Sequence, residues 1–428
     1  MARNEQNIIQ NLDWLSVLIY AACVSMGLFN VYASVYDPEE QTKLFDLSNN
    51  AGRQFMFIGT SALIVIAILV IDHKFWEVFA PFIYGACILL LLVVLVVATD
   101  IKGSKSWIKF GSFSLQPAEF AKTGTALLLS QFITQPHINL SRWKDIAWTA
   151  GIILLPMVLI VASKEVGCAL VFVSFLIVLY REGLPGIYPS IVLVAIVLFI
   201  LSLFFSPLYI SLGLTLFGFL VYYFIIPRYD RTKKTAINLV VIFGLMMFFT
   251  TSVEFLVNNV LQTHHRNRIK VLVDPKLDPT GIGWNVTQSK IAIGSGRLWG
   301  KGFLDGTQTK FNFVPEQHSD FIFCTIGEEH GFIGSAAVVL LLLGLMCRVV
   351  FLAERQRTRF ARAYGYCVAG ILFFHFLVNI GMTIGLMVVI GIPLPFFSYG
   401  GSSMWSFTIL LFIFLKLDAQ RPYTLSRT

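Results

Sequence analysis

Residues 82–98 read FIYGACILLLLVVLVVA, a run without a single charged side chain. An α-helix needs about 20 mostly apolar residues to cross the hydrocarbon core of a bilayer. Similar runs recur along the 428 residues, of which 56% are hydrophobic and 13% charged, whereas about a quarter are charged in soluble domains. This composition excludes a soluble enzyme, a disordered tail and a disulfide-stapled secreted module, and it predicts a polytopic membrane protein.

Polar and charged clusters divide the sequence into apolar segments. They predict an all-α polytopic integral membrane fold with about twelve transmembrane helices. The expected spans are 14–35, 54–72, 76–98, 117–135, 147–162, 166–181, 187–204, 206–226, 235–257, 320–347, 361–390 and 396–416. The joins at 162–166 and 204–206 are short, so kinked or re-entrant segments are the alternative there. Residues 1–428 are predicted to form a single membrane domain.

Lysine and arginine predict the orientation of the helices. The formal net charge of +8 is expected to lie in cytoplasmic loops and is not evidence of nucleic-acid binding. The basic clusters at 142–144, 228–234, 348–362 and 416–427 fall on one side of the predicted membrane. Both termini are therefore predicted to be cytoplasmic, and the large polar loop 258–318 to be extracytoplasmic. The six cysteines have no paired spacing, which predicts buried thiols rather than disulfides or a metal site.

The loop 258–318 contains the main candidates for chemistry. Asp274 and Asp278 each precede a proline, which disfavours the helical conformation at the aspartate. Gly281 and Gly283 then permit tight turns and close approach of the backbone to a ligand. Cations and aromatic residues in the same loop suit a phosphate-bearing ligand at the membrane interface. The alternative is a turn-rich loop whose Asp-Pro pairs only initiate turns.

A second polar cluster lies where the predicted span 117–135 begins. Glu119 and Lys122 are three residues apart, so on a helix they share a face and can form an ion pair. Charges inside a spanning segment are costly and often mark function, although a structural ion pair at the outer edge of the helix is the alternative. Lys109 departs from the positive-inside trend. It suits an anionic ligand at the outer leaflet, and a solvated interfacial lysine is the alternative.

Three further polar features interrupt apolar segments. Glu165 lies in the tight connection between two predicted spans, where a solvated turn residue is the alternative to a functional acid. His375 and Asn379 are four residues apart on an apolar helix, which favours an interhelical hydrogen bond. The segment 391–403, GIPLPFFSYGGSS, places Ser398 at the outer mouth of the last helix. It is expected to line the site, with a plain helix-entry loop as the alternative.

Four sequence blocks together resemble the SEDS family of bacterial shape, elongation, division and sporulation proteins. The blocks are QPAEFAK at 116–122, DPTGIGW at 278–284 with Gln288 and Ser289, PEQHSDFIF at 315–323, and GIPLP to SYGGS at 391–402. The run IAIGSG, followed by Gly306, is more similar to the elongation branch of the family than to its division branch. In two respects the chain departs from the family. Glu165 stands where the family commonly has aspartate, and the family usually has ten helices, which makes 206–254 a probable inserted pair.

The resemblance implies a peptidoglycan glycosyltransferase that polymerises lipid II at the outer face of the bacterial cytoplasmic (inner) membrane during cell elongation and shape maintenance. The implied partners are a class B penicillin-binding protein, the elongation machinery and membrane lipids, without nucleic acid. The acid on which the family's activity depends falls on Asp278. The family's glutamate and lysine fall on Glu119 and Lys122.

The resulting hypothesis makes Asp278 the general base that deprotonates the 4-hydroxyl of the acceptor sugar. The expected supporting or substrate-binding residues are Glu119, Lys122, Asp274, Arg268, Gln288, Ser289, Lys109 and Ser398. Asp274 is the alternative base. Lys122, Arg268 or loop lysines, or instead a divalent cation (Mg or Mn), would stabilise the leaving pyrophosphate; no other cofactor is expected. The rival hypotheses are a lipid II flippase or transporter, and a non-catalytic scaffold for a penicillin-binding protein.

Overall fold

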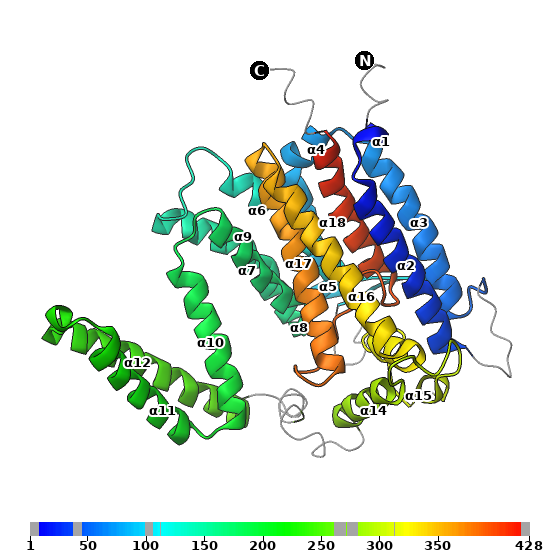
Figure 1. Cartoon of the computed structure of the whole chain (residues 1–428). Coiled ribbons are helices and arrows are strands. Elements are labelled where there is room, and N and C mark those ends of the chain that lie inside the picture. The colour runs from blue at the N-terminus through cyan, green and yellow to red at the C-terminus, as the bar shows by residue number, and fades with distance from the viewer. Residues whose placement is uncertain are drawn as a thin grey trace. The chain divides into compact units, whose positions relative to one another are not determined.

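The apolar segments of the sequence fold as helices in the computed structural model of the chain (Figure 1). The structure describes residues 8–36, 45–98, 106–111, 113–260, 271, 281–311 and 313–420. The chain divides into two compact units. The first comprises Met1–Leu184 and Gln288–Thr428, and the second comprises Pro185–Thr287.

The first unit contains most of the helices. They are α1 (Ile8–Asn11), α2 (Trp14–Val35), α3 (Asn50–Val70), α4 (His73–Val78), α5 (Ala80–Val97), α6 (Pro117–Ile133), α7 (Trp143–Ala162), α8 (Val166–Leu170), α9 (Phe175–Arg181), α15 (Thr307–Lys310), α16 (Ile322–Glu354), α17 (Arg359–Thr383) and α18 (Gly401–Ala419). A hairpin of β1 (Ile108–Phe110) and β2 (Phe113–Leu115) precedes α6, with Lys109 opposite Ser114. The predicted all-α fold is confirmed apart from this short hairpin.

Several helices begin where the sequence supplies a capping group. The side chains of Asp13, Asn49 and Thr358 accept hydrogen bonds from backbone N–H groups in the first turns of α2, α3 and α17. Such caps satisfy donors that the helix itself leaves free. Pro117 occupies the first position of α6, where its missing N–H costs nothing.

Helix α18 forms the centre of the first unit. It packs against α3, α6 and α17. In its most apolar stretch of 18 residues, 89% of the residues are buried. Helix α16 packs against α17 and α2, and α6 packs against α5 and α7. The core is therefore a helical bundle around α18, with the first turns of α6 and α18 close together in space.

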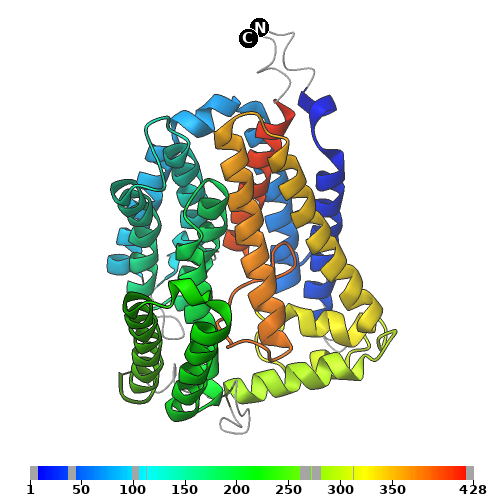
Figure 2. The ribbon, with the colours of Figure 1, turned by 60° about the vertical axis from the view of Figure 1, so that its left-hand side comes forward.

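The two ends of the first unit carry different connections (Figures 1 and 2). We call one the terminal end, because α1, the end of α18, α4 and the turn from α16 to α17 lie there. We call the other the loop end. It carries the β-hairpin, the turn from α7 to α8, α15 and the segment 384–400.

Ten helices within the described residues are long and apolar enough to cross a membrane. The other two predicted spans are also helical but shorter. Helix α6 has 17 residues, and the segment 166–181 is divided into α8, a 3-10 turn at Val171–Ser174 and α9. The multi-pass helical membrane fold is confirmed, while the number of crossings stays a prediction.

The second unit is a group of apolar helices. It contains α10 (Ile187–Phe204), α11 (Pro207–Leu220), a short π-helix (Val221–Ile225), a 3-10 helix (Arg228–Asp230), α12 (Lys233–Phe255) and a second short π-helix (Leu256–Val260). Helix α12 packs against both α10 and α11. The residues 206–254 fold as α11 and α12, as expected, while their being an insertion stays a prediction. Helix α14 (Ile282–Ser295) begins in this unit and ends in the first. The predicted loop 258–318 thus contains the helices α14 and α15.

Candidate active site

The start of α6 brings two charged side chains into the interior at the loop end. Glu119 and Lys122 lie on one face of the first turns, and their side chains are 0% and 1% exposed. The Lys122 ammonium lies 2.8 Å from Oε2 of Glu119. The ion pair predicted from their spacing is therefore present, and it is completely enclosed by protein.

His375 of α17 is a second partner of Lys122. Its Nε2 atom lies 2.7 Å from Nζ of Lys122, and its Nδ1 atom lies 3.1 Å from the carbonyl oxygen of Pro393. The ammonium also lies 5.0 Å from the centre of the Phe407 ring. A carboxylate, an imidazole and an aromatic face thus surround this buried cation, which is the environment that a desolvated charge requires.

Glu165 joins the same region from the turn between α7 and α8. The side-chain amide of Gln116 donates to both carboxylate oxygens of Glu165, at 2.7 Å each, and Ser106 also hydrogen-bonds to it. Burial raises the pKa of Glu165 above its usual range. Glu165 is therefore a half-buried turn residue held by hydrogen bonds, and a functional role for its carboxylate stays a prediction.

Cys168 connects the two carboxylates. Its thiol donates to Oε1 of Glu119 at 3.7 Å, and the side-chain amide of Gln116 lies 3.8 Å from the sulfur. We call the following residues the buried polar cluster, of which Gln116 and Glu165 are half-buried and the others buried: Gln116, Glu119, Lys122, Glu165, Cys168 and His375. The cluster runs from the loop end of the unit into its interior.

The segment 391–400 covers this cluster, and buried hydrogen bonds hold it. The side-chain amide of Asn379 donates to the carbonyl of Ile392 at 2.8 Å and to that of Asp320 at 2.9 Å. The hydroxyl of Ser398 accepts from the backbone N–H of Leu394 at 2.8 Å and donates to the carbonyl of Ser319 at 2.6 Å. Ser398 therefore fixes the segment 391–400. Asn379 is satisfied by hydrogen bonds, but both of its acceptors lie outside helices, so the predicted bond between two helices is not formed by Asn379.

Glu328 anchors the loop that precedes α16. Its buried carboxylate lies 2.6 Å from Nζ of Lys301 and accepts from the backbone N–H groups of Gln308 and Thr309, at 2.9 Å each. The backbone N–H of Lys301 in turn donates to the carbonyl of Glu328 at 3.0 Å. The loop 296–310 is thereby fixed to the start of α16.

The predicted site residues do not all meet. Ser289 donates to the carbonyl of Thr383 at 2.9 Å and so attaches α14 to the end of α17. The preceding residue, Gln288, is also buried. Lys109, on the hairpin, is exposed. Asp278, Asp274 and Arg268 lie outside the described residues.

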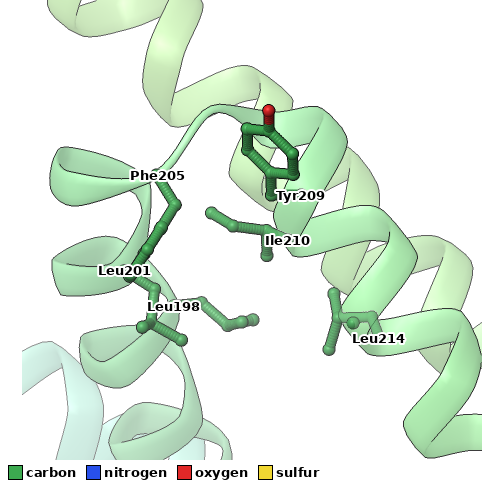
Figure 3. Close-up of a pocket in the computed structure, with 7 residues that line it drawn as sticks. Leu198, Leu201, Phe205, Tyr209, Ile210 and Leu214 are labelled. Carbon is green, nitrogen blue, oxygen red and sulfur yellow. The ribbon is translucent and has the colours of Figure 1, made fainter.

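A separate apolar hollow lies within the second unit, between α10 and α11 (Figure 3). It measures about 350 Å³, and its lining residues are Leu198, Leu201, Phe205, Tyr209, Ile210, Gly213 and Leu214. Its lining residues carry no charge, so they offer nothing to hold a pyrophosphate.

No group of three potential metal ligands of the His, Cys, Asp or Glu type occurs in the part of the chain that the structure describes. The two acids of the Asp-Pro pairs lie outside that part. The divalent cation therefore stays a prediction.

The sequence predicts the pair Glu119 and Lys122 but not the residues that surround it. His375 was expected to form a hydrogen bond between helices, which is confirmed, yet its partner was not foreseen. Ser106 and Cys168 were also missed, because a serine and a cysteine in apolar surroundings give no distinctive signal. The i,i+4 spacing of His375 and Asn379 was the signal that pointed to α17.

The fold and the buried polar cluster define a class of protein, a multi-pass helical membrane protein with charged residues enclosed at one end of its bundle. Comparison with known proteins identifies the family. A family model described as "Cell cycle protein", for FtsW, RodA and SpoVE, matches residues 13–217 and 212–423. The chain belongs to this FtsW/RodA/SpoVE family, and the SEDS resemblance is thereby confirmed.

Two relatives are similar over most of their length. Peptidoglycan glycosyltransferase RodA of Treponema pallidum (strain Nichols) is 28% identical over 436 residues, covering 96% of this chain and 99% of that protein. Peptidoglycan glycosyltransferase MrdB of Escherichia coli (strain K12) is 32% identical over 348 residues, covering 81% and 80%.

Two solved structures share the fold. One comes from a study entitled "Structural coordination of polymerization and crosslinking by a peptidoglycan synthase complex"; its chain has a TM-score of 0.69 and 26% identity, covering 96% of this chain and 98% of that one. The crystal structure of Thermus thermophilus rod shape determining protein RodA has a TM-score of 0.61 and 24% identity, covering 96% and 97%. At 24% identity, the similarity to this second structure shows a shared fold and no more.

Proposed function

We propose that this protein is a peptidoglycan glycosyltransferase that polymerises lipid II during cell elongation and shape maintenance. The observation that carries the proposal is the family match over residues 13–423, together with near full-length relatives that are named peptidoglycan glycosyltransferases. The buried polar cluster supports it, because enclosed charges in a membrane domain are costly and usually serve a function.

Asp278 is the proposed general base. It accepts the proton of the 4-hydroxyl on the acceptor's N-acetylglucosamine, and the resulting oxygen attacks the anomeric carbon of the donor sugar. The new bond joins that oxygen to the anomeric carbon, while the bond from the anomeric carbon to the phosphate oxygen breaks. Undecaprenyl pyrophosphate leaves with the bonding electrons. A positioned base contributes about 10²–10⁴-fold to such a step.

The leaving pyrophosphate needs positive charge that is not already neutralised. Lys122 is paired with Glu119, and Lys301 is paired with Glu328. Lys109, Arg297 and Lys310 are exposed. We therefore assign the contact with pyrophosphate to exposed cations of the loop end, together with Arg268, and we assign Lys122 to shaping the site. A divalent cation, if bound, would supply the same charge stabilisation.

The proposed setting is the outer face of the bacterial cytoplasmic membrane, with both termini in the cytoplasm. The proposed partner is a class B penicillin-binding protein, which crosslinks the glycan strands as they form. The similarity to a chain from a peptidoglycan synthase complex supports this partner.

The test is a polymerisation assay with purified full-length protein and lipid II in detergent. The expected result is glycan strands with the wild-type protein and none with Asp278→Ala, which should keep the wild-type unfolding temperature. Turnover by Asp278→Ala would remove the assignment of the base, and loss of turnover confined to Asp274→Ala would transfer the role to Asp274.

The same assay separates the rival functions. Movement of lipid II across proteoliposome membranes without polymer would identify a transporter. If the protein neither moves nor polymerises lipid II, alone or with its penicillin-binding partner, it is a scaffold. Either outcome would contradict the proposed function.

A further inference from the structure

His375 lies where three segments of the first unit meet. One turn apart on α17, His375 and Asn379 face the start of α6, the segment 391–400 and the residues that lead into α16. His375 is 0% exposed, as is Asn379. Neither side chain belongs to the chemistry proposed above, so their burial at this junction calls for an explanation.

The hydrogen bonds fix the state of the imidazole. The carbonyl of Pro393 can only accept, so Nδ1 of His375, 3.1 Å away, must carry the proton. The Lys122 ammonium can only donate, so Nε2 of His375, 2.7 Å away, must present its lone pair. The ring is therefore neutral in a single tautomer, and a protonated ring would place one N–H donor against another.

This arrangement links a charge to a backbone segment. Lys122 is held between Glu119 and His375, and His375 is held by Pro393. The segment that contains Pro393 also has positive φ angles, 78° at Gly391 and 67° at Phe396. A non-glycine residue such as Phe396 adopts this conformation only when its surroundings impose it, and such strain is concentrated at functional sites.

We propose that His375 is a positioning residue of the polymerase, which accepts a hydrogen bond from Lys122 and thereby orients the Lys122–Glu119 pair. The inference rests on the proposed function. His375 touches neither substrate nor leaving group, and it acts through Lys122; its bond to Pro393 fixes the tautomer that presents Nε2 to the ammonium. The bond to Lys122 is the important one, because hydrogen bonds to charged groups contribute more than neutral ones.

Two substitutions separate the two bonds of the imidazole. In His375→Gln the side-chain carbonyl can take the place of Nε2 and accept from Lys122, while the bond to Pro393 is lost. In His375→Asn the side-chain amide can take the place of Nδ1 and donate to Pro393, while Lys122 loses its acceptor. Exposed His137 at the terminal end provides the matched control His137→Asn.

The measurement is kcat and KM for lipid II polymerisation by each purified full-length variant, with its unfolding temperature. We expect His375→Asn to lower kcat by about 10- to 100-fold with KM changed less than about threefold, because the lost bond involves a charged group. His375→Gln should recover most of the wild-type kcat, and His137→Asn should match the wild type.

Equal kcat losses in the Asn and Gln variants, or wild-type kcat in both, would overturn the proposal. If His375→Asn does not stay folded, His375→Gln alone decides: a fall in kcat of more than about tenfold at an unchanged unfolding temperature would contradict the role of the Lys122 bond. A wild-type protein that makes no glycan would instead contradict the proposed function, so the two failures are distinguishable.

Discussion

Lys122 keeps a positive charge in a part of the bundle that is closed to solvent. Its side chain is 1% exposed, and its charge is balanced by one carboxylate, that of Glu119. Removing one partner of a buried ion pair usually costs more than the pair itself contributes, because the other charge is left without compensation. The pair is therefore sensitive to single substitutions, whatever its net contribution to folding.

We predict that Lys122→Met lowers the free energy of unfolding by about 3–5 kcal/mol, since it leaves the Glu119 carboxylate buried without a cation. Thermal unfolding in detergent measures the effect. Lys144→Met is the matched control, because Lys144 is exposed at the terminal end, and it should leave the unfolding temperature unchanged. Equal unfolding temperatures for the two variants would show that the buried charge is not costly.

Among side-chain contacts, the sequence predicts those between residues that are close together in the chain. Glu119 and Lys122 are three positions apart, and helical geometry alone brings them together. His375 is 253 positions from Lys122 and Glu165 is 49 positions from Gln116, so only the packing of helices reveals those contacts. The hydrogen bonds of Glu165 are likewise beyond prediction, because nothing in a short turn indicates the direction in which its carboxylate points.

Among the elements, α16 has an unusual start. Gly331 interrupts the helix with φ 65° and ψ −159°, a conformation that is almost restricted to glycine. A Cβ atom at Gly331 would collide with the backbone of Gly300 and lie 2.8 Å from the carbonyl group of Leu298. The interruption lets the loop 296–310 pack directly on the start of α16, next to the Glu328 anchor.

We predict that Gly331→Ala lowers the unfolding temperature and loosens the loop 296–310, because both the backbone angles and the space exclude a methyl group. Gly344→Ala is the control in the same helix. A Cβ atom at Gly344 would meet nothing within 4 Å, and alanine favours the helix by about 1 kcal/mol. Hydrogen exchange of the loop should increase in Gly331→Ala only. Unchanged exchange would contradict the packing argument.

Apolar runs predicted the elements themselves well, because a spanning helix needs little besides length and hydrophobicity. The apolar runs do not predict that a short 3-10 helix divides the segment 166–181. A run of apolar residues looks the same whether it forms one helix or two short ones. The hairpin at 108–115 was also missed, because its strands have three residues each and are too short for an alternating pattern.

For the whole molecule, four arginine–carboxylate pairs fasten the terminal end of the first unit. The pairs are Arg348–Asp13, Arg355–Asp418, Arg362–Glu182 and Arg181–Glu354, with closest N–O distances of 2.5–2.8 Å. In each pair two guanidinium nitrogens donate to the carboxylate, the geometry that arginine favours. This concentration of arginine at one end agrees with a cytoplasmic terminal end.

We predict that a membrane-impermeant maleimide labels Lys310→Cys in intact spheroplasts, whereas Arg357→Cys reacts only after permeabilisation. Lys310 is exposed at the loop end and Arg357 is exposed at the terminal end. Cys347 is exposed and the other five cysteines are buried, so both variants are made in a Cys347→Ser background. The opposite labelling pattern would invert the proposed orientation.

Helices α18 and α10 differ in burial, and this difference determines which substitutions each helix can tolerate during evolution. In the most apolar 18-residue stretch of α18, 89% of the residues are buried, whereas in that of α10 only 6% are buried. A substitution in α18 meets protein on nearly every side, so the volume and shape of each side chain are restricted. In α10 the surrounding lipid accepts many shapes, and only polarity is restricted. Neutral changes should therefore accumulate faster in α10 than in α18.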